Sequence, residues 1–304
     1  MNTIEQAARR LAQLRSAGVG TASELDTDLA MPEVDSRPAA ARQDAQRGAL
    51  GRLTRTGDAA DQPVAPPQVH IDLERLMNMG YVSPQAPSSR RAEEFRMVKR
   101  PLLTNARGGS AAPILHANRI LIASSLPGEG KTFVSINLAL SIAMERDSTV
   151  LLIDADATRP AVLERLGLPP SKGLLDVLSE PGLDVQTLLL QTNVDRLSIL
   201  PAGSLKQHAT ELLASERMSM LVEELSDSPH RILVFDAPPL LGSTESRVLA
   251  AHMGQIVFVI EADRTPQRQV FDALTILEDC PVVMTLLNKA SSSEAGSYYG
   301  SRVS

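Results

Sequence analysis

The sequence contains a single cysteine, Cys280, so no disulfide bond can form within the chain, which fits a reducing compartment. It has no apolar run of about 18 residues or more, and we therefore expect no membrane-spanning helix. The N-terminus lacks a basic region followed by an apolar one, which argues against a secretory signal. A formal net charge of -6 argues against a protein that coats nucleic acid. These absences predict a cytoplasmic protein with no nucleic-acid partner.

The 304 residues suffice for one large α/β domain with additional segments. Residues 1–18 predict an amphipathic helix, which either docks on a protein surface, the interpretation we favour, or lies on a membrane. Residues 19–68 have few large apolar residues, and we expect a mostly disordered linker over 19–92, with a short helix near 71–80. We expect the folded domain over 93–289 and a flexible tail over 290–304.

Within the expected domain, short runs rich in Ile, Val and Leu alternate with helical patterns. The candidate strands are Arg119–Ser124, Thr149–Asp154, Leu197–Pro201, Arg231–Asp236, Gln255–Glu261 and Val282–Asn288. Continuous apolar strands that alternate with helices predict a mostly parallel sheet covered by helices on both faces. Ligands bind such sheets at the carboxyl ends of the strands.

A glycine-rich loop follows the first of these strands and precedes a helical pattern. Residues 125–132 read Ser-Leu-Pro-Gly-Glu-Gly-Lys-Thr, which fits the phosphate-loop pattern G-x-x-x-x-G-K-[ST] except for Ser125. Its glycines let backbone N–H groups approach phosphate oxygens, Lys131 can reach the β and γ phosphates, and Thr132 can bind Mg²⁺. A chance glycine-rich turn is the alternative. The order of strand, loop and helix favours nucleotide binding.

Two further strands end in carboxylates, at Asp154 and Asp156 and at Asp236. A phosphate-bound Mg²⁺ needs such oxygen ligands, and like charges that cluster without a cation are costly. Alternatively, Asp156 caps a helix N-terminus. Arg159 either binds phosphate or pairs with an acid nearby. Asn288, with the lysine after it, either resembles the base-reading pair of other P-loop folds or is a turn residue.

Together these motifs resemble the bacterial tyrosine kinases that reuse a P-loop fold. Residues 124–132, 151–156 and 233–239 look like the three nucleotide motifs of that family. Residues 93–100 are similar to its E-x-x-R-x-x-R oligomerisation helix, and Tyr298-Tyr299 stands where the family carries its tyrosine cluster. More narrowly, the sequence looks like the exosortase-associated tyrosine autokinases, which act in exopolysaccharide synthesis.

The resemblance implies ATP and Mg²⁺ as cofactors and autophosphorylation, in trans within a homo-oligomer. Catalysis falls to Lys131, Asp154 and Asp156, with Asp154 close to the incoming tyrosine. Nucleotide contacts fall to Gly128, Glu129, Gly130, Lys131, Thr132, Phe133 and Asn288. Magnesium contacts fall to Thr132, Asp156 and Asp236. Phosphorylation falls to Tyr298 and Tyr299, and oligomerisation to Glu93, Arg96, Lys99 and Arg100. The implied partners are a membrane-embedded polysaccharide chain-length or export protein as activator, which would place the kinase at the inner membrane, and a cognate tyrosine phosphatase.

The chain departs from the family at Thr158 and Lys99, where the family has arginine. An arginine follows each position, but lysine does not reproduce the planar fork of arginine. Two other protein classes remain open. A positioning ATPase carries a second lysine five residues before the main one, where this chain has Leu126. A nucleotide-dependent scaffold of a polysaccharide-export complex would transfer no phosphate to protein.

Overall fold

The computed structural model describes residues 66–204, 208–228 and 230–290. The expected N-terminal helix over 1–18, the linker as far as residue 65, and the tail from residue 291 with Tyr298 and Tyr299 lie outside these described residues. No helix within the described ranges is both long and apolar enough to cross a membrane.

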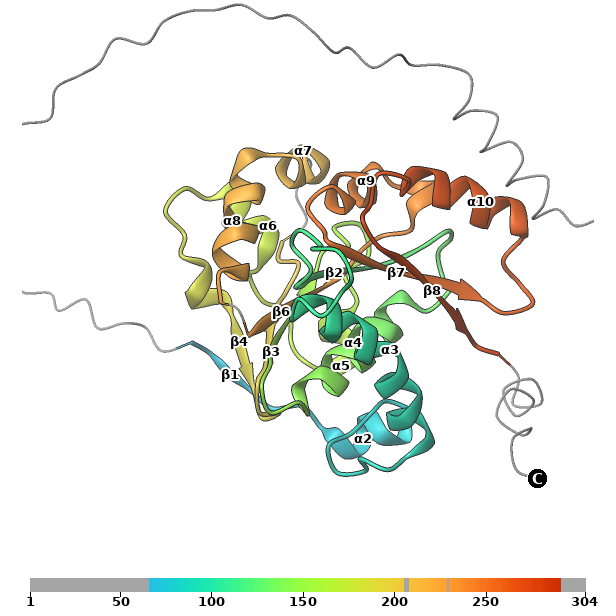
Figure 1. Ribbon diagram of the computed structural model, residues 1–304. Helices are drawn as coiled ribbons and strands as arrows, with labels where there is room; N and C mark the ends of the chain where they lie inside the picture. Colours follow the sequence, from blue (N-terminus) through green and yellow to red (C-terminus); the bar gives the residue numbers. More distant parts are fainter. Residues whose placement is uncertain (1–65, 205–207, 229, 291–304) are drawn as a thin grey trace, which may run out of the picture. The chain divides into compact units, whose positions relative to one another are not determined.

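In this part of the chain, eight strands form one sheet in the order β1-β4-β5-β3-β6-β2-β7-β8 (Figure 1). Neighbouring strands are parallel except β4 and β5, which pair antiparallel. The strands are β1 (Gln68–Val69), β2 (Arg119–Ser124), β3 (Thr149–Asp154), β4 (Leu190–Thr192), β5 (Leu197–Leu200), β6 (Arg231–Asp236), β7 (Gln255–Glu261) and β8 (Val283–Asn288). The predicted mostly parallel sheet is confirmed, and each of the six expected strands is present.

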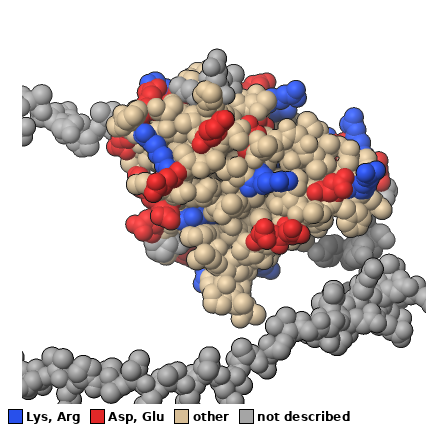
Figure 2. Space-filling model, turned by 90° about the horizontal axis from the view of Figure 1, so that it is seen from above, with Lys and Arg blue, Asp and Glu red and all other residues tan. Residues whose placement is uncertain are grey.

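Helices cover both faces of the sheet, as the sequence predicts (Figure 1). One face carries α2 (Leu73–Asn78), α3 (Arg90–Ala106), α4 (Lys131–Ala143) and α5 (Val162–Leu166). The other carries α6 (Leu174–Ser179), α7 (Ala209–Leu213), α8 (Glu216–Ser226), α9 (Thr244–Ala250), α10 (Gln267–Ile276) and the short helices η1 (Val185–Leu188) and η2 (Leu240–Gly242). On the side shown in Figure 2, acidic and basic side chains are interspersed, so this side presents no extended basic surface.

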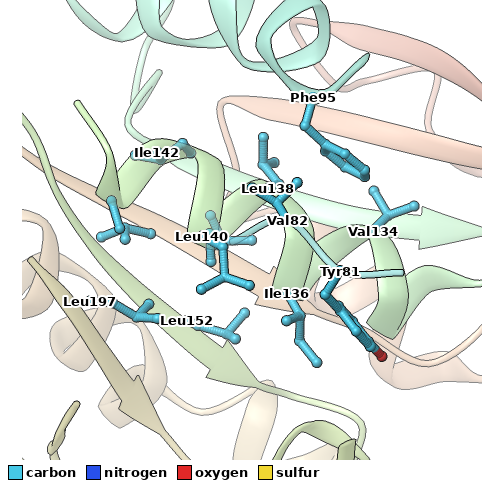
Figure 3. Close-up of a cluster of buried hydrophobic side chains, with 14 of the residues drawn as sticks. Tyr81, Val82, Phe95, Val134, Ile136, Leu138, Leu140, Ile142, Leu152 and Leu197 are labelled. Atoms are coloured by element: carbon cyan, nitrogen blue, oxygen red, sulfur yellow. The ribbon is translucent and has the colours of Figure 1, made fainter. Parts of the chain in front are cut away.

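Helix α4 is the centre of the first core. It is buried almost all round, because the sheet lies on one side and α3 and the 80–83 segment lie on the other. In Figure 3, Phe95 and Val82 point at the α4 side chains, while Leu152 comes from the sheet beneath. Each such fully buried aliphatic side chain contributes about 1.5–3 kcal/mol. This packing fixes the helix whose first turn ends the phosphate loop.

The folded unit begins earlier than the expected boundary at residue 93. Residues 68–69 pair with β4, and α2 occupies part of the short helix expected near 71–80. The Asn137 side chain on α4 accepts a buried hydrogen bond of 2.6 Å from the Val82 amide. Assigning residues 66–92 to a disordered linker is therefore wrong. Their few apolar residues, among them Ile71 and Tyr81, are buried, although the runs are too short to signal a domain.

Candidate active site

A cavity of about 1400 Å³ opens at the carboxyl ends of the central strands. One wall is the phosphate loop with the residues that follow β3, β6 and β8. Residues between 77 and 98, which precede the first central strand, also line it. This is the place where open parallel sheets bind their ligands.

The backbone of the phosphate loop requires its glycines. Gly128 and Gly130 have φ angles of 88° and 102°, a region that side chains other than glycine rarely enter. A Cβ atom on Gly130 would also collide with the Asn288 amide group. Gly130 directly precedes α4, so the positive end of that helix faces the cavity. The loop therefore forms a site for an anion such as phosphate.

Lys131 lies at the base of the loop and is buried. Its Nζ is 3.2 Å from Ser124 Oγ, to which it donates a hydrogen bond. Burial lowers the pKa of Lys131, while the carboxylates of Asp236, Asp156 and Glu129 oppose that shift. A lysine held this way carries a positive charge with little solvent around it, which strengthens its attraction for phosphate.

Two buried carboxyl groups lie at the ends of adjacent strands, since Asp154 of β3 and Asp236 of β6 are paired in register. Asp236 accepts hydrogen bonds from Ser135 Oγ, at 2.9 Å, and from Thr132. Burial raises the pKa of Asp236 to about 6. Burial first, and the charge of Asp236 second, raise the pKa of Asp154 to about 8. Both carboxyl groups would gain from a nearby cation.

Asp154 and Asp156 have different places, contrary to the expectation that both face the reaction. Asp154 is buried, and its Oδ2 accepts from the amides of Ala161 and Val162 at 3.0 Å each. It therefore caps α5 and is not among the residues that line the cavity. Asp156 lines the cavity and accepts from the amides of Thr158 and Arg159. The alternative in which Asp156 caps a helix is not what the structure shows for α5, because Asp154 accepts from the amides at its start.

These residues fit a magnesium ion. Thr132, Asp156 and Asp236 offer only oxygen atoms, as this hard cation prefers. The described residues hold no group of three His, Cys, Asp or Glu side chains that could bind a metal alone. A metal at this place therefore needs the Thr132 hydroxyl and further oxygens, which a nucleotide's phosphates can supply. The P-loop fold and this donor set indicate the use of a nucleotide with Mg²⁺.

Hydrogen bonds of the side chains of Glu129, Asn288 and Lys289 stabilise the backbone of the phosphate loop. Glu129 is buried, accepts from the Leu126 amide at 2.7 Å, and accepts from the Thr265 hydroxyl. Asn288 donates to the Glu129 carbonyl at 2.9 Å, and Lys289 donates to the Gly128 carbonyl at 2.8 Å. Glu129 and Asn288, expected to contact the nucleotide, thus contact the loop itself. Asn288 and Lys289 also line the cavity, and base reading by this pair stays a prediction.

Phe133, in the first turn of α4, lines the cavity as part of a stack. The Tyr81 ring lies 4.9 Å from its centroid, and the Arg91 guanidinium lies 5.2 Å from it. Sequence reasoning missed Tyr81 and Arg91, because both fall before or at the edge of the expected domain. It also missed Arg165, which lines the cavity from α5. No motif marks these three residues.

The four residues expected at an oligomer interface lie on two sides of α3. Glu93 and Arg96 form an ion pair near the surface, and Arg100 is exposed. Lys99 instead points into the fold, where its Nζ lies 2.6 Å from the Ser141 carbonyl oxygen and 2.8 Å from Glu145 Oε1. Lys99 thus joins α3 to the end of α4, and it is not a surface residue.

The fold and the phosphate loop together define a P-loop nucleotide-binding protein. Residues 117–267 match the family model described as an AAA domain. Tyrosine-protein kinase YwqD of Bacillus subtilis (strain 168) is 28% identical over 231 residues, which are 74% of this chain and 93% of that protein. Succinoglycan biosynthesis transport protein ExoP of Rhizobium meliloti (strain 1021) is 33% identical over 218 residues, 70% of this chain but only 27% of that longer protein.

A solved structure, the kinase domain of VpsO, is 30% identical with a TM-score of 0.53, and the match covers 64% of this chain and 99% of that one. The chain belongs to the bacterial P-loop tyrosine kinase family, related to the kinases of exopolysaccharide systems. It is a tyrosine kinase by this membership. The resemblance seen in the sequence is therefore confirmed at the level of the family.

Proposed function

We propose that this kinase transfers the γ-phosphoryl group of ATP to Tyr298 and Tyr299 of another copy of the same chain, in trans within an oligomer. By this transfer it would regulate exopolysaccharide synthesis or export. The observation that carries the proposal is the cavity in which Lys131, the loop amides and Asp156 converge. The names of the relatives supply the acceptor class and the polysaccharide context. The phosphorylated and oligomerising residues are carried over from the family resemblance.

The chemistry is an in-line displacement at the γ-phosphorus. A bond forms from the tyrosine oxygen to phosphorus, the bond from phosphorus to the ADP oxygen breaks, and the phenolic proton leaves to solvent or to a carboxylate in the cavity. Lys131 and the amides of the loop stabilise the charge on the transferred group. Magnesium, bound by Thr132, Asp156 and Asp236, would neutralise phosphate charge. Asp156, which faces the cavity, is better placed than Asp154 to accept the proton.

We also propose that Glu93, Arg96 and Arg100 contribute to the subunit interface, because they lie near the surface of one α3 face. An activator in the membrane would bring the kinase to the inner membrane, and a tyrosine phosphatase would reverse the modification. These partners follow from the family and not from any surface of the described residues.

The test is to map phosphorylation sites by mass spectrometry after the purified chain is incubated with Mg-ATP. We expect phosphate on Tyr298 or Tyr299, and a loss of about 10²–10³-fold in its rate of formation in Lys131→Ala, the loss typical when one charge-stabilising donor is removed. Lys172→Ala is the matched control, because Lys172 is an exposed lysine paired with Glu180. ATP hydrolysis without phosphotyrosine, with the membrane partner's cytoplasmic segment added, would favour a scaffold or a positioning ATPase instead.

A further inference from the structure

The cavity is larger than a nucleotide needs. Pockets for small molecules commonly enclose about 300–1,000 Å³, whereas this one holds about 1400 Å³. The phosphate loop forms only part of its lining, and residues between 77 and 98, together with Ala161 and Arg165 at α5, form another part. A second ligand can therefore lie beside the nucleotide.

The charged side chains of the cavity show what that ligand carries. Six basic residues and two carboxylates line it. Among them, Arg90 and Arg91 pair with Glu94. Lys289 donates to the loop and pairs with Glu261. Lys131 belongs to the phosphate site. Of the two carboxylates, Glu94 pairs with arginines, and Asp156 accepts hydrogen bonds from two backbone amides.

This leaves Arg159 and Arg165. Both are exposed at the cavity, on the loop before α5 and on α5 itself, and neither guanidinium has a side-chain hydrogen bond or ion pair with another described residue. The charge of Arg165 acts on Tyr81 of the same cavity, where it opposes the rise that burial gives the Tyr81 pKa. A guanidinium group recognises carboxylate or phosphate through paired N–H donors. Two guanidinium groups that line one cavity without an ion pair to a described residue therefore favour an anionic ligand there. We name them the arginine pair.

The chain itself supplies such a ligand close by. Ala290, the last described residue, lines the same cavity. Tyr298 follows eight residues later, a distance of at most about 26–29 Å at 3.3–3.6 Å per residue. Between them stands Glu294, the only carboxylate side chain beyond residue 290.

We propose that the arginine pair binds an anionic side chain next to the acceptor tyrosine, and so selects acidic acceptor segments. This inference rests on the proposed kinase activity and names its substrate class. The anion is the Glu294 carboxylate or, once one tyrosine of the pair is modified, the phosphate on its neighbour. The nucleotide's phosphates have other partners available, because Lys131, the loop amides and the N-terminus of α4 already form an anion site.

The experiment uses the full chain with Tyr298→Phe and Tyr299→Phe as the enzyme, and a synthetic peptide of residues 290–304 as the acceptor. Three peptides are compared: the natural one, one with Glu294→Gln, and one that carries phosphotyrosine at 299. Arg159→Gln and Arg165→Gln, singly and together, are set against Arg268→Gln. Arg268 is an exposed arginine of α10 outside the cavity, with its side chain 92% exposed, and it serves as the matched control.

With both arginines replaced, we expect the KM of the natural peptide to rise about tenfold, the effect of losing one good charged contact, while the KM of ATP stays within about twofold. The Glu294→Gln peptide should show the raised KM with the unchanged enzyme and no further rise with the double variant. If the phosphotyrosine peptide alone responds to the arginine pair, the neighbouring phosphate is the anion and Glu294 is not.

Equal KM values for all peptides across all enzymes would overturn the inference and leave the kinase function standing. The same arginine substitutions in the chain with its own tyrosines provide a second measurement, the initial rate of tail phosphorylation at low ATP. Unchanged rates there would overturn it as well. If the unaltered chain forms no phosphotyrosine on tail or peptide, the proposed function itself has failed.

Discussion

The phosphate loop and the arginine pair line one cavity, but they differ in whether their polar side chains are hydrogen-bonded within the protein. In the loop, Glu129, Asn288 and Lys289 are all bonded to the backbone of the loop or to its neighbours. Neither Arg159 nor Arg165 forms a side-chain hydrogen bond or ion pair with another described residue, although the charge of Arg165 acts on Tyr81. Groups bonded within the protein fix a shape before any ligand arrives, as charge stabilisation requires. Unbonded charges at a rim remain to be paired by what enters. The phosphate loop is thus preorganised, whereas the proposed acceptor site would be completed by its ligand.

Helix α3 shows the same contrast, between a charge that is bonded to other described residues and one that is not, at two adjacent residues, Lys99 and Arg100. We expect the largest effect on stability from a substitution at Lys99. Lys99→Met leaves the partly buried Glu145 carboxylate and the Ser141 carbonyl without their partner. We expect the free energy of unfolding to fall by about 2–3 kcal/mol, somewhat below the loss for a fully buried pair, because Glu145 is partly solvated. Urea denaturation measures this loss.

Arg100→Met is the matched control, since Arg100 is exposed on the same helix. It should change stability by less than about 0.5 kcal/mol, and its effect should appear in the oligomeric state by light scattering. Equal losses for both variants would show that the two faces of α3 do not differ in this way.

A smaller effect is expected from Glu129→Ala in the loop. The change leaves the Leu126 amide and the Thr265 hydroxyl without their acceptor, and we expect a loss of about 1–3 kcal/mol in stability with weaker ATP binding. Calorimetric titration and urea denaturation measure the two effects. Arg165→Ala should leave stability within about 0.5 kcal/mol. A Glu129→Ala variant with unaltered ATP affinity would contradict the view that the hydrogen bonds of Glu129 stabilise the ATP-binding form of the loop.

The last prediction concerns pH. Burial raises the pKa values of Asp154 and Asp236 to about 8 and about 6, above their ordinary value. The folded state therefore holds more protons than the unfolded state, and the stability of metal-free protein falls as pH rises from about 4 to about 8. We expect the Tm to drop by several degrees between pH 5.5 and 8.5. Asp236→Asn should reduce the dependence of Tm on pH. A Tm that rises between pH 5.5 and 8.5 would refute the raised pKa values of Asp154 and Asp236.

The sequence sufficed for the central sheet because six of its strands are continuous apolar runs, each long enough to stand out. It could not reveal β1 and β4, whose two and three residues carry no periodicity. The phosphate loop was predictable for a related reason, since its backbone needs glycine at fixed places. Side-chain direction was not predictable in the same way. A lysine in a helical pattern is expected at the surface, and only the packing of α3 on α4 shows that Lys99 is buried.

The roles of individual polar residues were the least predictable part of the site. Asp154 and Asp156 are two residues apart, and only the position of α5 determines which of them caps it. Asn288 lies at the end of β8, and its contact with the loop depends on a pairing across 159 positions of sequence. Contacts of this kind come from tertiary packing, which a local pattern does not encode.

The position of Ala290 at the cavity rim has a kinetic consequence. A group joined to a site by a short tether is present there at an effective concentration that reaches the millimolar range for flexible links, whatever the total protein concentration. Transfer to a chain's own tail would then be first order in protein, whereas transfer to a free copy would be second order. Subunit assembly offers a second donor site at comparable effective concentration. Assembly would thus decide which active site each tail meets, rather than whether it meets one.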